Sequence, residues 1–345
     1  MDSRRALGIG LVVVSAAGFA SGSLLARPAY DTGIDWLTLV GWRFLIGAGL
    51  AWAWVAISPT HRSAVRRMPR TQVLAAIGLG AMFTGNAGTY YAALETVPPA
   101  LASVLVYTYP VFVAVLSLRF ATRLPGRRPW LALGLAVVGV VLALGGIDPS
   151  AAPPVEGLVL VMASALIYSV WIILSARLSG ERRDRIASDV ATPTPIGDAA
   201  VTTAIMMTAT GAVFATAAAV TGQPLDPRTI PAEAWPFLGA IGFVASFLAI
   251  QTFYAGARRI GAAQAALVAT VEPVFIVVAA ALILGEVLMP LQLVGAGCIL
   301  VGVIIAQTAP RPRGAPVPAT PLEAELDTNG GPEGTDDRQR SAVDA

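Results

Sequence analysis

Apolar segments of about 20 residues follow one another along almost the whole chain, which leaves little room for a water-soluble fold. A helix of this length crosses the roughly 30 Å hydrocarbon core of a bilayer. The first five segments cover residues 6–27, 36–57, 71–93, 98–118 and 129–147. The next five cover residues 157–177, 198–221, 234–256, 261–284 and 289–308. The sequence therefore predicts an all-α membrane protein with ten transmembrane helices.

Composition supports this assignment and excludes several other classes. Hydrophobic residues make up 56% of the 345 residues and charged residues only 13%, whereas soluble domains have roughly 25% charged residues. The only cysteine is Cys298, and the only histidine is His61, which lies in a basic segment predicted to be a loop. These two residues are too few for a disulfide framework or a Cys/His metal site. We therefore expect no metal, no cofactor and no nucleic-acid partner.

The two ends of the chain need separate interpretations. Arg4 and Arg5 precede the first apolar run, as in a secretion signal, but that run continues for about 20 residues without a clear cleavage site. We interpret it as the first spanning helix. From Pro310 onward the chain is rich in Pro, Gly, Asp and Glu, a composition that cannot bury a core. Residues 310–345 are therefore predicted to be a disordered cytoplasmic tail.

The arginines indicate the orientation in the membrane. With the N-terminus in the cytoplasm, 18 arginines up to Arg313 fall on the cytoplasmic side, and only Arg27 and Arg228 fall opposite. Cytoplasmic loops carry an excess of positive charge, so we predict that both termini of this multi-pass chain face the cytoplasm. One helix more or fewer would place the later clusters on the wrong side.

The chain also repeats itself in two halves, predicted to be residues 6–147 and 156–308. A shift of 163 residues superimposes Thr89 and Tyr91 on Thr252 and Tyr254, and the segment Pro-Val-Phe at 110–112 on the same residues at 273–275. Each half has five helices. Because five is odd, the second half must enter the membrane in the opposite sense, as in the inverted repeats of many transporters.

Specific motifs in these repeats resemble a known family. They are TYYAALETVPPALASVLVYTYPVFVAVL, TFYAGARRIGAAQAALVATVEPVFIVVAAALILGE and WRF at residues 42–44. They resemble the paired repeats of the EamA branch of the drug/metabolite transporter superfamily. The resemblance implies a ten-helix bundle with a central cavity lined mainly by helices 1–4 and 6–9. It also implies movement of amino acids or other small metabolites, often outward and in some members by proton exchange. One departure is Thr122-Arg123, where the first half of the family often has glycine and glutamate.

Two formal charges lie deep inside apolar segments, namely Arg43 and Glu272. A charge at a helix centre costs at least about 2.5–3.5 kcal/mol, so each is a candidate functional residue. Arg43 could bind a substrate carboxylate through two parallel hydrogen bonds. Glu272, if desolvated, is suited to proton exchange. The alternative is that the two residues neutralise each other as a structural lock.

Prolines and polar residues complete the candidate set. Pro110 and Pro273 fall at equivalent mid-helix positions, where each should kink its helix. Paired broken helices point to a transport site, although a static kink needed for packing is the alternative. Polar or aromatic residues in the segments could contact a solute, with interhelical packing as the alternative for each: Asn86, Tyr90, Tyr91, Tyr107, Tyr109, Tyr168, Trp171, Gln251, Tyr254 and Gln264.

These observations predict a secondary transporter and not an enzyme. We expect it to move a small, amino-acid-like organic metabolite outward across the cytoplasmic membrane by alternating access, with protons as a candidate coupling partner. A channel-like pore, an intramembrane enzyme and a membrane scaffold are the alternatives. Against an enzyme, the chain has no HExxH pair, GxSxG elbow or P-loop. The sequence leaves the choice between monomer and homodimer open.

Overall fold

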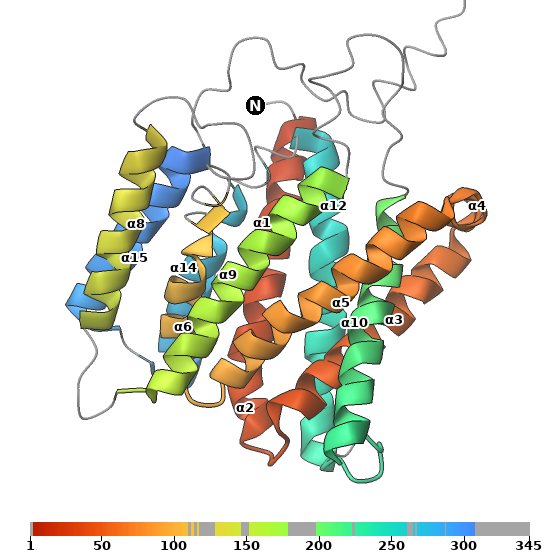
Figure 1. Ribbon diagram of the computed structural model, residues 1–345, viewed down its shortest axis with the longest axis horizontal. Helices are drawn as coiled ribbons and strands as arrows, with labels where there is room; N and C mark the ends of the chain where they lie inside the picture. Colours follow the sequence, from red (N-terminus) through yellow and green to blue (C-terminus); the bar gives the residue numbers. More distant parts are fainter. Residues whose placement is uncertain are drawn as a thin grey trace, which may run out of the picture. The chain divides into compact units, whose positions relative to one another are not determined.

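The computed structural model describes residues 3–109, 112–113, 116, 128–145, 152–178, 198–222, 225–260, 265, 268–286 and 288–307. All regular elements within these ranges are helices, so the predicted all-α class is confirmed (Figure 1). The chain divides into two units, Met1–Ala309 and Pro310–Ala345. The predicted tail lies outside the described residues, and the helices below all belong to the first unit.

The helices of the first half follow the predicted segments, with α2 as a short extension of the first segment and one addition. Their bounds are α1 Ser3–Leu24, α2 Ala26–Tyr30, α3 Trp36–Ile57, α4 Pro59–Arg67, α5 Arg70–Ala93, α6 Pro99–Val106 and α8 Arg128–Gly145. The addition is α4, because the basic segment around His61 is helical and not a loop. Pro59 occupies the first turn of α4, where its fixed φ favours helix and its missing N–H is not needed.

The second half contains helices of more than one type. Its elements are α9 Val155–Leu178, α10 Ala199–Thr221, η2 Ala232–Ala234, α11 Trp235–Ala240, η3 Ile241–Leu248, α12 Ala249–Ile260, α14 Glu272–Ala279, η4 Ala280–Leu284 and α15 Pro290–Gln307. Both η3 and η4 are π-helical. Such wide turns are rare and often occur at functional sites. The apolar pattern of the sequence did not predict them.

Among the residues that the structure describes, five helical stretches are long and apolar enough to cross a membrane. They are Arg5–Tyr30, Trp36–Ile57, Val155–Leu174, Ala199–Thr221 and Ala232–Phe253, and shorter apolar helices cover Glu272–Leu284 and Pro290–Ile305. Parts of the predicted fourth and ninth segments lie outside the described residues. The described helices therefore fit a multi-pass membrane fold, and the count of ten stays a prediction.

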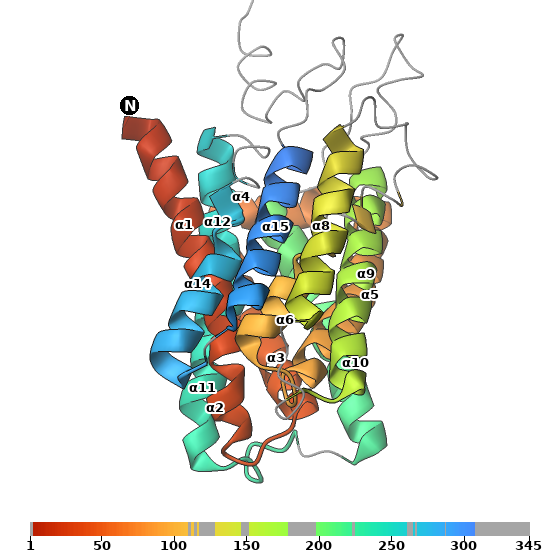
Figure 2. The same ribbon diagram turned by 90° about the vertical axis from the view of Figure 1, so that its left-hand side faces the viewer.

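The two halves of the sequence interleave in space. The main helix pairs each join the first half to the second: α1 with α12 and α14, α3 with α10 and η3, α5 with α9 and α10, α6 with α14, and α8 with α15 (Figures 1 and 2). Small residues allow this close approach. A Cβ added to Gly256 would lie 2.8 Å from the Gly8 carbonyl oxygen, and one added to Gly139 would lie 2.6 Å from that of Gly295.

Candidate functional site

Helices of both halves are broken at equivalent residues. In the first half, α6 ends at Val106, and Tyr107 and Thr108 form a turn before helix resumes at Tyr109. In the second half, Thr270 and Val271 form the corresponding turn before α14 begins at Glu272. The repeat shift of 163 residues relates the two turns residue by residue. The same backbone interruption is therefore built twice.

Proline explains the position of the second break. Pro273 lies in the first turn of α14, where a proline is tolerated because no helical N–H bond is lost there. The chain thus forms a new helix start where we expected a kink within a continuous helix. Pro110, its counterpart in the first half, lies outside the described residues.

The two breaks contact each other through Glu272. The Tyr107 hydroxyl donates a 3.0 Å hydrogen bond to Glu272 Oε2 and lies 3.4 Å from the Ala269 carbonyl oxygen. Glu272 is half-buried in the first turn of α14, where the helix dipole favours a negative charge. An acid from one half is therefore held by a tyrosine at the break of the other half.

Arg43 has a separate set of partners. Its Nε donates a 2.8 Å hydrogen bond to the hydroxyl of Ser246, which is buried within η3. Its guanidinium carbon lies 4.8 Å from the ring centre of Tyr91 and 5.2 Å from that of Phe44, within the range of cation–π attraction. Both Arg43 and Glu272 are described, and no ion pair within 4.0 Å joins them. Each charge is thus held by neutral groups.

A row of aromatic rings extends from the surroundings of Glu272 to those of Arg43. Successive ring centres lie 4.8 to 6.1 Å apart, which is the usual spacing of interacting aromatic pairs. We call this set the aromatic row, and its members in order are Tyr107, Tyr109, Tyr168, Trp171, Phe83 and Phe44. The indole nitrogen of Trp171 donates to the Leu79 carbonyl at 3.0 Å, which fixes its ring.

The remaining predicted residues have different surroundings. Asn86 Nδ2 donates to the Ser164 hydroxyl at 2.8 Å, and Ser164 donates back to the Asn86 carbonyl at 3.1 Å, so this pair ties α5 to α9. Gln251 is half-buried on α12. The side chain of Tyr254 and the whole of Gln264 lie outside what the structure describes.

Three residues of the site were not among the predicted candidates: Ser246, Phe44 and Phe83. Ser246 is a polar residue within an apolar segment, the same signal that identified Gln251. Phe44 and Phe83 give no such signal, because phenylalanine is common throughout apolar segments. Their place in the aromatic row follows only from the packing of α3 against α5 and of α5 against α9.

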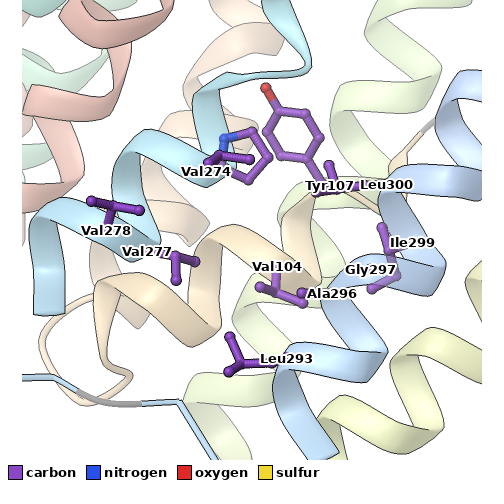
Figure 3. Close-up of a pocket in the computed structure, with 11 residues that line it drawn as sticks. Val104, Tyr107, Val274, Val277, Val278, Leu293, Ala296, Gly297, Ile299 and Leu300 are labelled. Atoms are coloured by element: carbon purple, nitrogen blue, oxygen red, sulfur yellow. The ribbon is translucent and has the colours of Figure 1, made fainter. Parts of the chain in front are cut away.

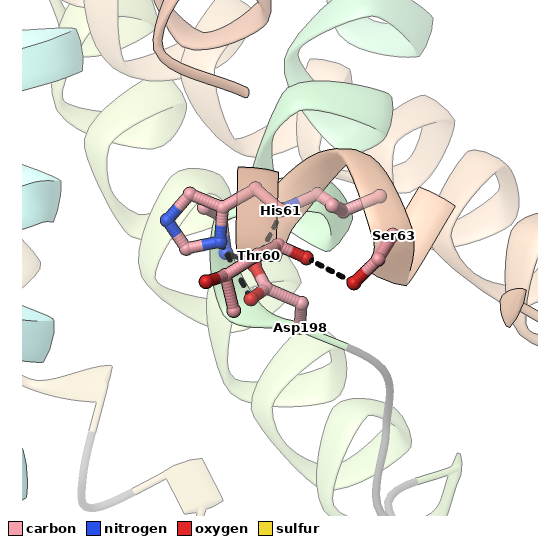
Figure 4. A network of polar contacts seen from close by, with 6 residues as sticks. Thr60, His61, Ser63 and Asp198 are labelled. Atoms are coloured by element: carbon pink, nitrogen blue, oxygen red, sulfur yellow. Dashed lines mark hydrogen bonds and ion pairs between the residues drawn. The ribbon is translucent and has the colours of Figure 1, made fainter. Parts of the chain in front are cut away.

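A second polar cluster lies where α4 meets the start of α10 (Figure 4). His61 Nδ1 lies 2.7 Å from Asp198 Oδ2, and both side chains are 20% exposed. The other carboxylate oxygen of Asp198 accepts hydrogen bonds from the backbone N–H of Ala200 and Val201, which caps α10. No group of three or more metal-ligating side chains occurs among the described residues. His61 belongs to the first half of the chain and Asp198 to the second. We call their contact the clamp, because it joins the two halves.

Two further acidic residues, Glu95 and Glu286, cap the starts of α3 and α6. Glu95 Oε1 accepts from the Trp36 N–H at 2.8 Å, and Glu286 Oε2 accepts from the Ala100 N–H at 3.2 Å. Partial burial raises the pKa of the Glu286 carboxyl, and the Ala100 hydrogen bond and the charge of Arg27 offset only part of that rise. Glu286 thus joins the LGE motif of the second half to the start of α6.

Comparison with known proteins identifies the family. The sequence pattern of the EamA-like transporter family matches residues 6–145 and 155–308. The chain belongs to this family. The resemblance found in the sequence is thereby confirmed, and with it the assignment as a multi-pass membrane protein of a transporter family.

Individual relatives of this EamA-like chain agree with the assignment. The uncharacterized inner membrane transporter YedA of Escherichia coli is 24% identical over 270 residues, which are 78% of this chain and 80% of the relative. An uncharacterized transporter of Synechocystis sp. is 28% identical over 112 residues, or 31% of this chain and 33% of the relative. A crystal structure with 21% identity covers 86% of this chain and 96% of its own, with a TM-score of 0.58. That likeness concerns the fold alone.

Proposed function

We propose that this EamA-like protein is a secondary transporter that moves a small, amino-acid-like solute outward across the cytoplasmic membrane by alternating access. The observation that carries the proposal is the pair of equivalent helix breaks that meet at the Tyr107–Glu272 hydrogen bond. Broken helices at the interface of inverted repeats commonly form the substrate and ion sites of secondary transporters.

The partners of the two charges suit an exchange with a substrate. Arg43 is bonded to the Ser246 hydroxyl and Glu272 to the Tyr107 hydroxyl. Breaking a buried ion pair would leave one charge uncompensated, which is strongly unfavourable. Replacing a neutral hydroxyl by a substrate group avoids that cost. We propose that Arg43 binds the carboxylate of the solute and that Glu272 binds its ammonium group or a coupled proton.

The proposal includes the topology of the chain. Ten helices in two inverted repeats, residues 6–147 and 156–308, would place both termini and the tail at 310–345 in the cytoplasm. Single cysteines in a Cys298→Ser background test this. Cysteines at positions 60 and 126 should react with an impermeant reagent only from inside, and those at positions 150 and 226 only from outside. One position labelled from the wrong side would refute the ten-helix topology.

Counterflow in proteoliposomes tests transport itself. Vesicles are loaded with one unlabelled amino acid at a time from a panel of neutral, acidic and basic amino acids and their amides, and a trace of the same labelled solute is added outside. A carrier should accumulate label only when the solute is present on the far side. Uptake that does not depend on the internal solute would indicate a pore. Amides taken up as well as the parent acids would contradict the role of Arg43.

A further inference from the structure

An apolar groove lies between α6, α14 and α15 (Figure 3). Its volume is about 240 Å³, and its walls include Val104 of α6, Val274 and Val278 of α14, and Leu293 and Gly297 of α15. Of the described residues that line the groove, Tyr107 is the one with a polar side-chain atom. That hydroxyl is already bonded to Glu272. The groove therefore offers a ligand hydrocarbon contacts and no free polar partner.

In the predicted topology the groove opens toward the lipid and not toward water. Val274, Val278 and Leu293 remain 42% to 51% exposed, and Val274 lies in the first turn of α14, near the middle of the predicted ninth segment. At that depth the surrounding solvent is the hydrocarbon of the bilayer. Water would not fill the space, because a buried water molecule needs two to four polar partners.

These properties fit one kind of occupant. A lipid headgroup would lose its hydration at this depth without compensation, whereas an acyl chain requires only apolar walls. We propose that the groove binds one acyl chain of a membrane lipid. The chain packs against the face of the Tyr107 ring that lines the groove, while the hydroxyl of the same ring holds Glu272. Tyr107 thus contacts both the lipid chain and Glu272 of the candidate transport site.

A glycine on the groove wall allows a direct test. A Cβ added to Gly297 would meet no heavy atom within 4 Å, so Gly297→Phe should enter the groove without displacing the backbone. Gly134 on α8 provides the matched control. It is the equivalent residue of the first half, it is also exposed, its added Cβ also meets open space, and it does not line the groove.

Photolabelling measures occupancy without any transport assay. The full-length protein is placed in phosphatidylcholine vesicles that contain a lipid with a diazirine on one acyl chain, and labelled peptides are mapped after irradiation. In the wild type, label should concentrate on the groove residues and exceed several-fold that on Val294 and Val301, which are exposed on α15 outside the groove. Gly297→Phe should lose most of the groove label, and Gly134→Phe should keep it.

Three results would overturn the proposal. Equal labelling of the groove and of Val294 and Val301 in the wild type would mean that no chain is bound specifically. Unchanged groove label in Gly297→Phe would mean that the chain lies elsewhere. Efficient cross-linking of two copies through Val278→Cys in a Cys298→Ser background, with little groove label, would mean that a second protein molecule covers the groove. The wild-type map decides the question even if Gly297→Phe fails to fold.

Discussion

The two halves of the chain repeat the same helix break but supply different chemistry to the site. At the break, the position that holds Tyr109 in the first half holds Glu272 in the second. In the preceding segment, the position of Phe83 corresponds to that of Ser246. The first-half residues are members of the aromatic row, and the second-half residues bind Tyr107 and Arg43. The two halves therefore share the helix break, and different residues at equivalent positions give the first half aromatic contacts and the second half polar contacts.

The helices that carry these residues differ as well. Phe83 lies on α5, which is α-helical from Arg70 to Ala93. Its counterpart Ser246 lies on η3, a π-helical segment. The wider π turn rotates the residues that follow relative to a regular helix. The comparison teaches that the two repeats need not remain alike where one half must present a hydroxyl to a charge.

The largest expected difference concerns the break. If Glu272 binds the ammonium group of the solute, Glu272→Gln should reduce solute-driven counterflow by about tenfold or more, because a hydrogen bond to a charged group is worth roughly 1.5–3 kcal/mol. If it binds the coupled proton, Glu272→Gln should abolish proton-driven uptake and leave counterflow intact. Tyr109→Phe, at the equivalent position, keeps the ring in the aromatic row and should change the rate less than about twofold, since no charged partner is lost. Initial rates in proteoliposomes measure both. Wild-type rates and pH dependence in Glu272→Gln would rule out the proposed role of the acid.

Stability distinguishes this role from that of a structural lock. If Glu272 only neutralised Arg43, Glu272→Gln would destabilise the protein, and adding Arg43→Gln would partly restore its melting temperature. We expect no such rescue, since the structure shows each charge bonded to its own neutral hydroxyl.

The second prediction compares a hydroxyl in the π-helical η3 with one in the α-helical α12 that follows it. Ser246→Ala removes the acceptor of Arg43 Nε and leaves a charged donor unsatisfied, which should cost about 1–3 kcal/mol of stability. Thr252→Ala is the control, because the Thr252 hydroxyl bonds carbonyls of its own helix turn, at Leu248 and Ala249. Thermal unfolding in detergent measures both. Equal melting temperatures for the two variants would show that the Ser246 contact is dispensable.

Much of the fold was predictable from sequence, for identifiable reasons. The apolar segments predicted the all-α class, and the EPVF and LGE motifs predicted the family; both predictions are confirmed. Residues 241–248 are apolar or glycine apart from Ser246, so no periodicity reveals that they form a π-helix. The contact between Tyr107 and Glu272 joins positions 165 residues apart. It depends on how the halves interleave, which a single sequence does not specify.

A smaller difference is expected at the helix caps. Asp35 and Asp198 occupy equivalent positions and cap α3 and α10, but only Asp198 also contacts His61. Loss of a cap costs roughly 1 kcal/mol, so both alanine variants should be destabilised by about that amount. Asp198→Ala should lose about 1 kcal/mol more, the net contribution of a typical hydrogen bond. In a His61→Ala background the extra loss should disappear, and its persistence would contradict the clamp.

The smallest expected effect is the pH dependence of stability due to Glu286, which caps the start of α6. Partial burial raises the pKa of Glu286 above its usual value near 4.5, so the folded protein binds this proton more tightly than the unfolded chain does. Unfolding free energy must then increase as pH falls through the raised pKa toward 4.5. Glu286→Gln removes this contribution. The melting temperature of the wild type should therefore rise relative to that of Glu286→Gln between pH 7 and pH 5. A relative fall would mean that the hydrogen bond from Ala100 outweighs burial and that the carboxylate stabilises the fold.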